Sequence, residues 1–407
     1  MIITTVDRKH IRPPYYVLDE DRLQRVFLRL ERAFSSLYDK SIIAYSYKAN
    51  YVPYMCKALH TLGAYAEVAS RLEYDVACRL INNTSHIIFN GPVKRYGDIE
   101  IALQNHSIVN LDSFNEIEHV KKYCLKNPRK KVDIGVRVNF SLPQDFGLRV
   151  KTSRFGFCLE NGDLKKAFMS IREIPHAKVV SLQAHFSSRY RNQYIYREVT
   201  ARLCEIARQY LKGSVDYIDI GGNFGHAPKE MTDLRFPTFE EYARAIVSEL
   251  KKHTSHQFKP FLIIEPGISL VGQAYSFVCN VIEVKKIRRK KFIVVDGSVH
   301  NVKPTMHPYN LPVKVLDSEG KIKHGSNVTY QVVGHTCMEK DCLLKNLKGP
   351  EVRAGDYLVF GNVGAYTIVL NPPFIHPRPP ILVKKDNEYS VIRRGETFKD
   401  FFATFKF

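Results

Sequence analysis

Lys48 is the residue around which the possible chemistry of this sequence gathers. It lies in the segment YSYKAN at residues 45–50, directly after the apolar run at residues 42–44. We therefore expect it just past the C-terminal end of a buried strand. An unpaired ammonium is costly to bury unless its pKa falls, and an amine with a lowered pKa is the form that reacts with carbonyl compounds. A single lysine after a strand is more often a solvated loop residue. Whether Lys48 is reactive therefore depends on which other residues the fold brings near it.

Other groups with useful chemistry are expected at the ends of later strands. His185 and Glu265 each follow an apolar run, and two segments carry closely spaced glycines, GGNFG at 221–225 and EPG at 265–267. Glycine lets backbone N–H groups approach an anion such as phosphate. An amine, an imidazole, a carboxylate and a phosphate loop are together what pyridoxal phosphate requires. Each of these groups alone is weak evidence for a pyridoxal phosphate site. His185 could be a core histidine, and the loop at 221–225 also resembles an S-adenosylmethionine site.

The elements that must position these groups follow a repeated strand–helix pattern. Strands are expected near residues 42–47, 64–68, 86–90, 107–111, 133–139, 179–185, 217–220 and 261–265, with helical periodicity between them. An open doubly wound sheet could use the same alternation. Eight units are the number in a closed (β/α)8 barrel, which needs roughly 250 residues. We therefore predict an α/β fold with a TIM barrel over residues 25–268.

A second domain is expected after the barrel. Runs of alternating polarity at residues 277–284, 292–295 and 328–333 are separated by turn residues. Alternating runs separated by turns predict an antiparallel β domain of sandwich or barrel type over residues 269–407. The strand expected within residues 1–24 could join it.

Composition narrows the possible partners and compartment. The 407 residues include 61 basic and 41 acidic side chains, a net charge of +20. Basic runs at 129–131 and 285–291 are either solvated loop tips or a surface for a polyanionic partner or acidic substrate. No nucleic-acid motif, membrane span or secretion signal is recognised, so neither nucleic acid nor membrane is an expected partner. The eight cysteines form no Cys-x-x-Cys pair, which predicts reduced thiols in the cytoplasm and no metal site.

Eight short motifs carry a family resemblance. They are YSYKAN (45–50), RVN (137–139), RFGF (154–157), HFSS (185–188), IGGN (220–223), EPG (265–267), GHTC (334–337) and GAY (364–366). In this order they resemble the group IV, fold-type III decarboxylases, which include the diaminopimelate, ornithine and arginine decarboxylases. The resemblance runs from about residue 12 to Phe374. It implies a pyridoxal 5'-phosphate-dependent α-decarboxylase of an amino acid, working as a head-to-tail homodimer with shared active sites.

The resemblance also implies residue roles. Lys48 would hold the cofactor covalently, His185 would stack on its ring, and Glu265 would pair with the pyridine nitrogen. Further cofactor-binding positions would be Glu67, Arg137, Ser188, Gly221, Gly222, Asn223, Gly267 and Tyr366. Cys337 would come from the partner subunit and return a proton after CO2 leaves.

The substrate side departs from the family pattern. Ile268 replaces the arginine usual after Glu-Pro-Gly, and Lys303 and His307 occupy the element that binds the distal carboxylate of diaminopimelate. Lysine keeps the charge of the usual arginine but loses its bidentate fork. Met338 stands where an acidic residue reads the distal amine, and Glu339 is displaced by one position. The resemblance still implies that Lys303, His307, Met338 and Glu339 bind the substrate.

Two explanations compete for these departures. The substrate could be unusual, such as an amino acid conjugated to an acidic group or attached to a carrier protein, as in a siderophore or other specialised-metabolite pathway. Alternatively, the chain binds the cofactor without catalysis and acts by protein association. The joint persistence of Lys48, His185, Glu265 and Cys337 favours catalysis. An amino-acid racemase would need a second base, commonly tyrosine, and only Tyr366 stays open for that role.

Overall fold

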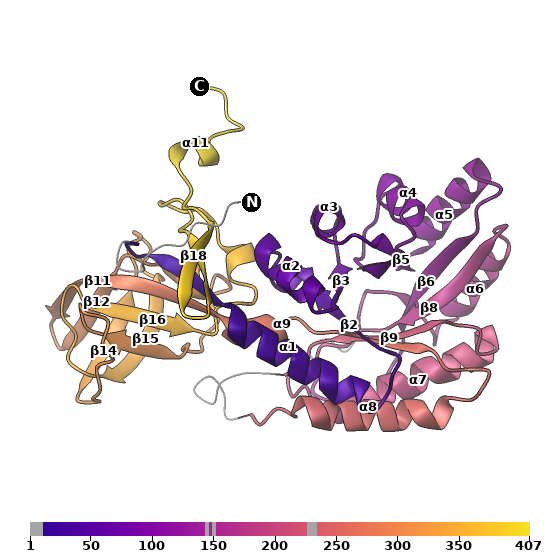
Figure 1. Ribbon diagram of the computed structural model, residues 1–407, viewed down its shortest axis with the longest axis horizontal. Helices are drawn as coiled ribbons and strands as arrows, with labels where there is room; N and C mark the ends of the chain where they lie inside the picture. Colours follow the sequence, from indigo (N-terminus) through magenta and orange to yellow (C-terminus); the bar gives the residue numbers. More distant parts are fainter. Residues whose placement is uncertain (1–10, 143–145, 149–151, 226–233) are drawn as a thin grey trace. The chain divides into compact units, whose positions relative to one another are not determined.

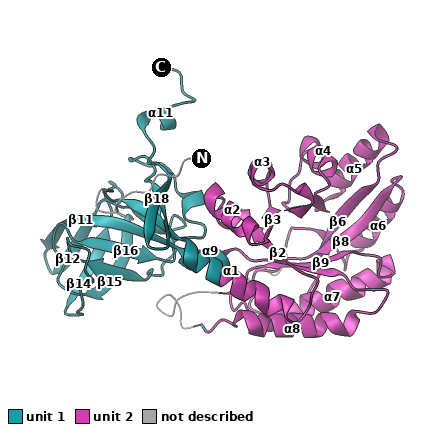
Figure 2. Cartoon of the chain, in the orientation of Figure 1, with its two compact units in different colours: residues 1–25, 226–234, 268–407 teal, residues 26–225, 235–267 magenta. Residues whose placement is uncertain are grey.

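The chain divides into two compact units (Figure 2). The computed structural model describes residues 11–142, 146–148, 152–225 and 234–407. One unit contains the described parts of residues 26–225 and 235–267. The other contains those of residues 1–25, 226–234 and 268–407. Below they are called the barrel unit and the β unit.

The barrel unit is built on eight parallel strands that close on themselves. The strands are β2 (Ser41–Ser46), β3 (Tyr65–Val68), β4 (Ile87–Phe89), β5 (Ile108–Leu111), β6 (Val132–Asn139), β8 (Ala177–Gln183), β9 (Tyr217–Gly222) and β10 (Phe261–Glu265). Each pairs with the next, and β10 pairs with β2, which completes the ring. The predicted (β/α)8 barrel is therefore confirmed, and the open sheet is excluded. A short strand, β7 (Phe157–Cys158), adds to β6.

Helices surround these strands in Figure 1. They are α2 (Pro53–Thr61), α3 (Arg71–Leu80), α4 (Tyr96–Gln104), α5 (Phe114–Lys126), α6 (Asp163–Arg172), α7 (Gln193–Leu211) and α8 (Phe239–His253), with α1 (Glu20–Ser35) before the first barrel strand. Several helix starts are fixed by a side-chain cap. Thr238, for example, accepts the N–H of Glu241, whose carboxylate accepts the N–H of Thr238 in return. Apolar residues of β2, β4, β5 and β10 form one buried cluster, which holds the strand ends at fixed positions.

The β unit contains a nine-stranded sheet. Its strands are β1 (Tyr15–Asp19), β11 (Tyr275–Ile287), β12 (Lys290–Val295), β13 (Val313–Leu316), β14 (Val328–Val333), β15 (Cys342–Gly349), β16 (Tyr357–Gly361), β17 (Ile381–Lys385) and β18 (Glu388–Arg393). Most pairs are antiparallel, as predicted, and β1 does join this sheet. The β1–β17 and β12–β14 pairs are parallel, so the sheet is mixed. Both parallel pairs join strands far apart in the chain, where no hairpin imposes an antiparallel arrangement.

Three short helices lie in the same part of the chain: α9 (Ile268–Val271), α10 (Val299–Val302) and α11 (Phe398–Phe401). Among the helices of the described residues, none is long and apolar enough to cross a membrane.

Candidate functional site

Lys48 lies where the sequence predicts, one turn past the end of β2. It belongs to the short 3-10 helix Tyr47–Ala49, and its Nζ forms an ion pair with Glu67 Oε2 on the neighbouring strand β3. Burial acts to raise the pKa of Glu67. The Lys48 charge and hydrogen bonds from Lys48, Ser46 and Asn90 outweigh burial and lower that pKa below its usual value. Glu67 is therefore an ionised, buried counterion for an amine that remains 39% exposed.

Asn90 connects two buried carboxyl groups of the site. Its Nδ2 donates to Glu67 Oε1 at 3.2 Å and also to Glu265 Oε1 at the end of β10. Its Oδ1 accepts from Asn110 Nδ2 at 2.7 Å, which fixes the orientation of the amide. No motif in the sequence marks Asn90 as a site residue. The available signal was a polar residue at the end of the predicted strand 86–90.

The buried ion pair of Lys94 and Glu116 fixes the backbone of Asn90. Lys94 Nζ donates to the carbonyl of Asn90 at 3.0 Å and to that of Gly91 at 2.7 Å. The same ammonium lies 2.9 Å from Glu116 Oε2, and both side chains are buried. A buried lysine that is satisfied in this way fixes the backbone around it. Lys94 is thus a second residue that the sequence analysis missed.

His185 is held as a neutral imidazole. It lies two residues past β8, and its Nδ1 is 3.1 Å from the backbone N–H of Gly222. That N–H is a donor, so Nδ1 accepts and the ring proton lies on Nε2. Burial, followed by the charges of Lys48 and Arg137, lowers the pKa of His185 to about 3. The ring therefore stays uncharged at neutral pH.

The glycine pair after β9 is required by close packing. A Cβ on Gly221, where φ is +70°, would lie 2.7 Å from His185 Nδ1, and one on Gly222 would lie 1.9 Å from the carbonyl oxygen of Glu265. The N–H of Gly221 donates to Asp219 Oδ1 at 2.9 Å, and that of Gly222 donates to His185. These two N–H groups are thus already used inside the protein. The glycines bring β9, the histidine and β10 together.

Three other residues are expected to contact a phosphate. Asn223 has φ of +75°, a left-handed backbone that is more usual for glycine, and its Nδ2 donates to the Ser188 carbonyl at 3.3 Å. Ser188 Oγ is buried and donates to the carbonyl of Phe146 at 2.6 Å. A Cβ on Gly267 would lie 3.1 Å from the Cβ of Ala49, beside the lysine.

Arg137 reaches the site with its own counterion. Its Nη1 lies 3.3 Å from Asp112 Oδ2, and its guanidinium stacks 4.7 Å from the ring centre of Phe155. Its charge lowers the pKa of His185, which places the two groups in one electrostatic environment. Together with Lys48, Glu67 and Glu265, it completes the set of barrel residues that the structure gathers at the strand ends.

The remaining predicted residues lie in the β unit. Cys337 is exposed in a turn held by Asp341, whose carboxylate accepts the N–H of Val299 at 2.7 Å and the N–H of Thr336 at 3.1 Å. Beside Cys337 in this turn, Met338 is half-buried and Glu339 is exposed, whereas Tyr366 is 40% exposed.

Lys303 and His307 lie close together in the same unit. Burial lowers the pKa of both, and the charge of Lys303 lowers that of His307 further. Lys303 is 5% exposed, which is rare for a lysine. The pair is therefore a buried ammonium beside an uncharged imidazole.

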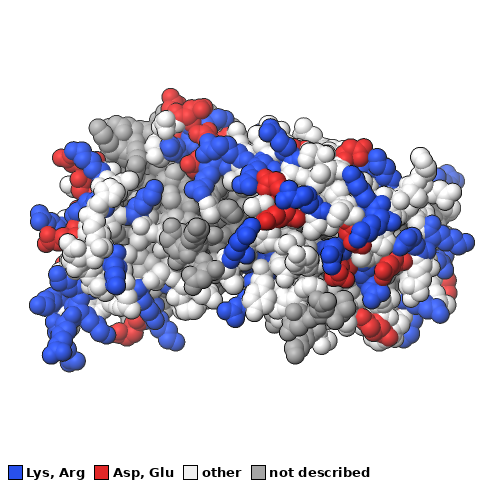
Figure 3. Space-filling view, turned by 90° about the horizontal axis from the view of Figure 1, so that it is seen from below, with Lys and Arg blue, Asp and Glu red and all other residues white. Residues whose placement is uncertain are grey.

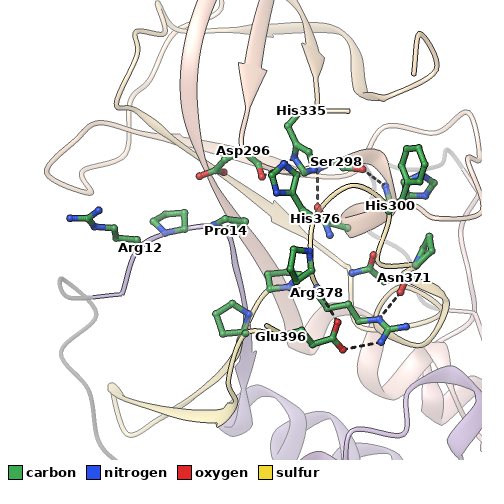
Figure 4. A pocket seen from close by; sticks show the side chains of 18 of the residues that line it. Arg12, Pro14, Asp296, Ser298, His300, His335, Asn371, His376, Arg378 and Glu396 are labelled. Atoms are coloured by element: carbon green, nitrogen blue, oxygen red, sulfur yellow. Dashed lines mark hydrogen bonds and ion pairs between the residues drawn. The ribbon is translucent and has the colours of Figure 1, made fainter. Parts of the chain in front are cut away.

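The β unit also contains a cavity of about 500 Å³ that the sequence did not suggest (Figure 4). His335 and His376 meet edge to face there at 4.3 Å, and burial raises the pKa of Asp296 to about 6. Arg378 is paired with Glu396 at 2.9 Å and donates to the carbonyl of Asn371. The polar groups of its wall are thus largely bonded to one another.

Basic side chains are scattered over the face drawn in Figure 3 and gather at its lower left. The run at 285–291 forms the tip of the β11–β12 hairpin, and all seven of its residues are exposed. Within the described residues no group of His, Cys, Asp and Glu side chains is placed to hold a metal ion.

Comparison with known proteins gives a consistent family likeness. A family model described as "Pyridoxal-dependent decarboxylase, pyridoxal binding domain" matches residues 22–272. The diaminopimelate decarboxylase of Helicobacter pylori J99 is 26% identical over 400 residues, which cover 96% of this chain and 94% of that protein. A probable chloroplastic diaminopimelate decarboxylase of Oryza sativa is 29% identical over 406 residues, covering 97% and 80%.

The fold likeness to solved structures extends over both units. The crystal structure of a diaminopimelate decarboxylase from M. jannaschii superposes with a TM-score of 0.87 at 24% identity, over 98% of this chain and 93% of that one. The H. pylori enzyme complexed with L-lysine superposes with a TM-score of 0.84.

Proposed function

This chain belongs to the pyridoxal-dependent decarboxylase family, and from that membership we propose how its own residues serve the reaction. It is a pyridoxal phosphate-dependent carboxy-lyase of amino-acid metabolism. We propose that it removes the α-carboxyl group of an amino acid whose far end carries a negative charge. The observation that carries the reaction is the Lys48 amine held at the strand ends by buried Glu67, beside neutral His185 and buried Glu265.

The donor set fits pyridoxal phosphate. Lys48 supplies an accessible amine for covalent attachment, and Glu67 keeps that amine oriented. His185 offers an uncharged aromatic face, because its pKa is far below neutral. Glu265 offers a buried carboxylate for the ring nitrogen. When bound, the cofactor supplies an electron sink for the pair of electrons left behind by CO2.

The phosphate contacts are assigned to groups that lie around the glycine pair. They are the backbone of Asn223 and Gly267 and the Ser188 region, with Arg137 as a nearby positive charge. Tyr366 of the β unit is a further proposed phosphate contact, from the family resemblance alone. Gly221 and Gly222 contribute chiefly by allowing the close packing that brings these groups together, because their N–H groups donate to Asp219 and His185.

We assign the returning proton to Cys337 of a second subunit in a head-to-tail homodimer. The thiol is exposed in the single chain and lies in a turn held firmly by Asp341, so it is free to enter a neighbouring barrel. A mixture of Lys48→Ala and Cys337→Ala chains tests this arrangement. In a shared-site dimer about a quarter of the sites regain both residues and form correctly protonated amine. If each chain used its own Cys337, the mixture would form none.

Two residues of the β unit favour a substrate whose far end carries a negative charge. Lys303 is a largely buried ammonium beside His307, which suits a carboxylate or another acidic group. Met338 cannot read a distal amine. The net charge of +20 favours acidic partners, including an amino acid attached to an acidic carrier protein. All eight cysteines are free thiols, which favours a reducing compartment such as the cytoplasm.

CO2 release from a panel of amino acids tests the proposal. The panel contains diaminopimelate, ornithine, lysine, amino acids with a distal carboxylate, and acidic conjugates. We expect kcat/KM to favour distal acids, and Lys303→Met to reduce that preference ~10- to 100-fold, because a charge-assisted hydrogen bond is lost. Lys345→Met, at an exposed neighbouring position, is the matched control. Equal use of ornithine and distal acids would refute the distal-charge assignment, and absence of CO2 from every compound would refute catalysis.

A further inference from the structure

Two buried carboxyl groups lie on neighbouring strands behind the proposed cofactor site. Asp219 on β9 is fully buried, and Glu265 at the end of β10 is 3% exposed. The register between these strands shifts between Ile263, opposite Asp219, and Glu265, opposite Gly222. Across this irregularity the two carboxyl groups are close enough for each to change the pKa of the other.

A hydrogen bond between two carboxyl groups requires a proton. Asp219 Oδ1 accepts the N–H of Gly221 at 2.9 Å. Within the part of the chain that the structure describes, no donor group reaches Asp219 Oδ2. Ionised carboxylates are acceptors only, so Asp219 Oδ2 can find a partner in the Glu265 carboxyl group only if one of the two is protonated.

The surroundings place that proton on Asp219. Burial is the largest effect on both groups and raises both pKa values, and the charge of Glu67 raises them further. Glu265 also receives the Lys48 charge and the Asn90 N–H, which favour its ionised form. At Asp219 the Glu265 charge acts in addition and outweighs the hydrogen bond from the Gly221 N–H, so the pKa of Asp219 is raised well above the usual range. Asp219 is therefore the donor and Glu265 the anion.

We propose that Asp219 is a positioning residue that donates its carboxyl proton to Glu265 and thereby fixes that carboxylate for its contact with the cofactor ring nitrogen. This inference rests on the proposed role of Glu265. Glu67, Asp219 and Glu265 face one ammonium, that of Lys48. Fully ionised, they would leave two uncompensated negative charges in a buried site, whereas a proton on Asp219 leaves one. A protonated ring nitrogen neutralises that remaining charge.

The competing reading is that Asp219 only anchors the turn at Gly221. An asparagine tests the difference, because its Oδ1 can accept the Gly221 N–H and its Nδ2 can donate to Glu265. It reproduces the protonated acid and removes the titratable group. Asp219→Ala loses both hydrogen bonds. Asp216→Asn, at a side chain that is 55% exposed, is the matched control.

Infrared difference spectroscopy on the cofactor-free protein at neutral pH reads the proton directly. We expect a protonated-carboxyl C=O band in the wild type that Asp219→Asn removes and Asp216→Asn leaves unchanged. Titration with pyridoxal phosphate gives the second readout. Asp219→Asn should bind within ~3-fold of the wild type and Asp219→Ala ~10- to 100-fold more weakly, because a hydrogen bond to a charged group is lost.

Loss of an ionised-carboxylate band in Asp219→Asn would overturn the inference, and so would unchanged cofactor affinity in Asp219→Ala. If Asp219→Ala does not fold, the infrared comparison of the wild type with Asp219→Asn still decides whether Asp219 carries the proton. A wild-type protein that takes up no pyridoxal phosphate would instead overturn the proposed function. The infrared result would then still locate the proton, because it needs no cofactor.

Discussion

Replacing Gly222 with alanine adds one methyl group at the tightest contact of the candidate site. The added Cβ would lie 1.9 Å from the carbonyl oxygen of Glu265 and 2.9 Å from its carbonyl carbon. The backbone of Gly222 is not in the left-handed region, so the whole cost comes from this overlap. Backbone atoms cannot move away as a flexible side chain can. Strands β9 and β10 must therefore separate.

Separating the two strands lowers stability because it breaks hydrogen bonds of both backbones. The carbonyl of Glu265 accepts from Ser46 Oγ at 3.2 Å, and the N–H of Gly222 donates to His185 at 3.1 Å. Overpacking costs ~1–3 kcal/mol and each lost hydrogen bond ~1 kcal/mol, so we expect the free energy of unfolding to fall by ~3–5 kcal/mol. Cofactor affinity should fall as well, because the imidazole loses the contact that orients it.

The assay is urea unfolding followed by far-UV circular dichroism, since the chain has no tryptophan. Gly97→Ala is the matched control. This glycine lies in α4 with nothing within 4 Å of an added Cβ and no left-handed φ. We expect that variant to be unchanged or stabilised by up to ~1 kcal/mol. If Gly222→Ala loses less than ~1 kcal/mol, close packing is not the reason for the glycine.

Three further predictions test individual groups. Lys48→Ala should abolish the borohydride-reducible link between protein and pyridoxal phosphate, whereas exposed Lys57→Ala in α2 should retain it, as read by mass spectrometry. Because the pKa of His185 is about 3 when folded against 6.5 ordinarily, the unfolded chain binds the extra proton in between. The free energy of unfolding should therefore fall as pH drops from 6.5 toward 3, and His185→Phe should flatten that part of the curve. Lys94→Met should lower the free energy of unfolding in urea by ~3–5 kcal/mol, because it leaves Glu116 buried without its cation. Adding Glu116→Gln should recover much of that loss. If the losses of the two single variants simply add in the double variant, this explanation is wrong.

The sequence by itself was enough to predict the barrel and the position of Lys48, the proposed cofactor-binding lysine. Strand and helix periods are local properties, so eight strand–helix units could be counted without knowing how they pack. The location of Lys48 one turn after β2 follows from the apolar run that precedes it. Motif types at successive strand ends then predicted His185 and Glu265 as neighbours, because the ends of parallel strands in a barrel converge on one face.

Only the tertiary structure decided which polar groups are already bonded. The N–H groups of Gly221 and Gly222 looked available for phosphate, but the register of β9 directs them to Asp219 and His185. The sequence likewise could not predict that the amide of Asn90 bridges two carboxyl groups, since these lie 23 and 175 residues away along the chain. Hydrogen-bond partners and burial depend on the register of strands distant in sequence. Local patterns do not encode that register, whereas closure of the barrel fixes it.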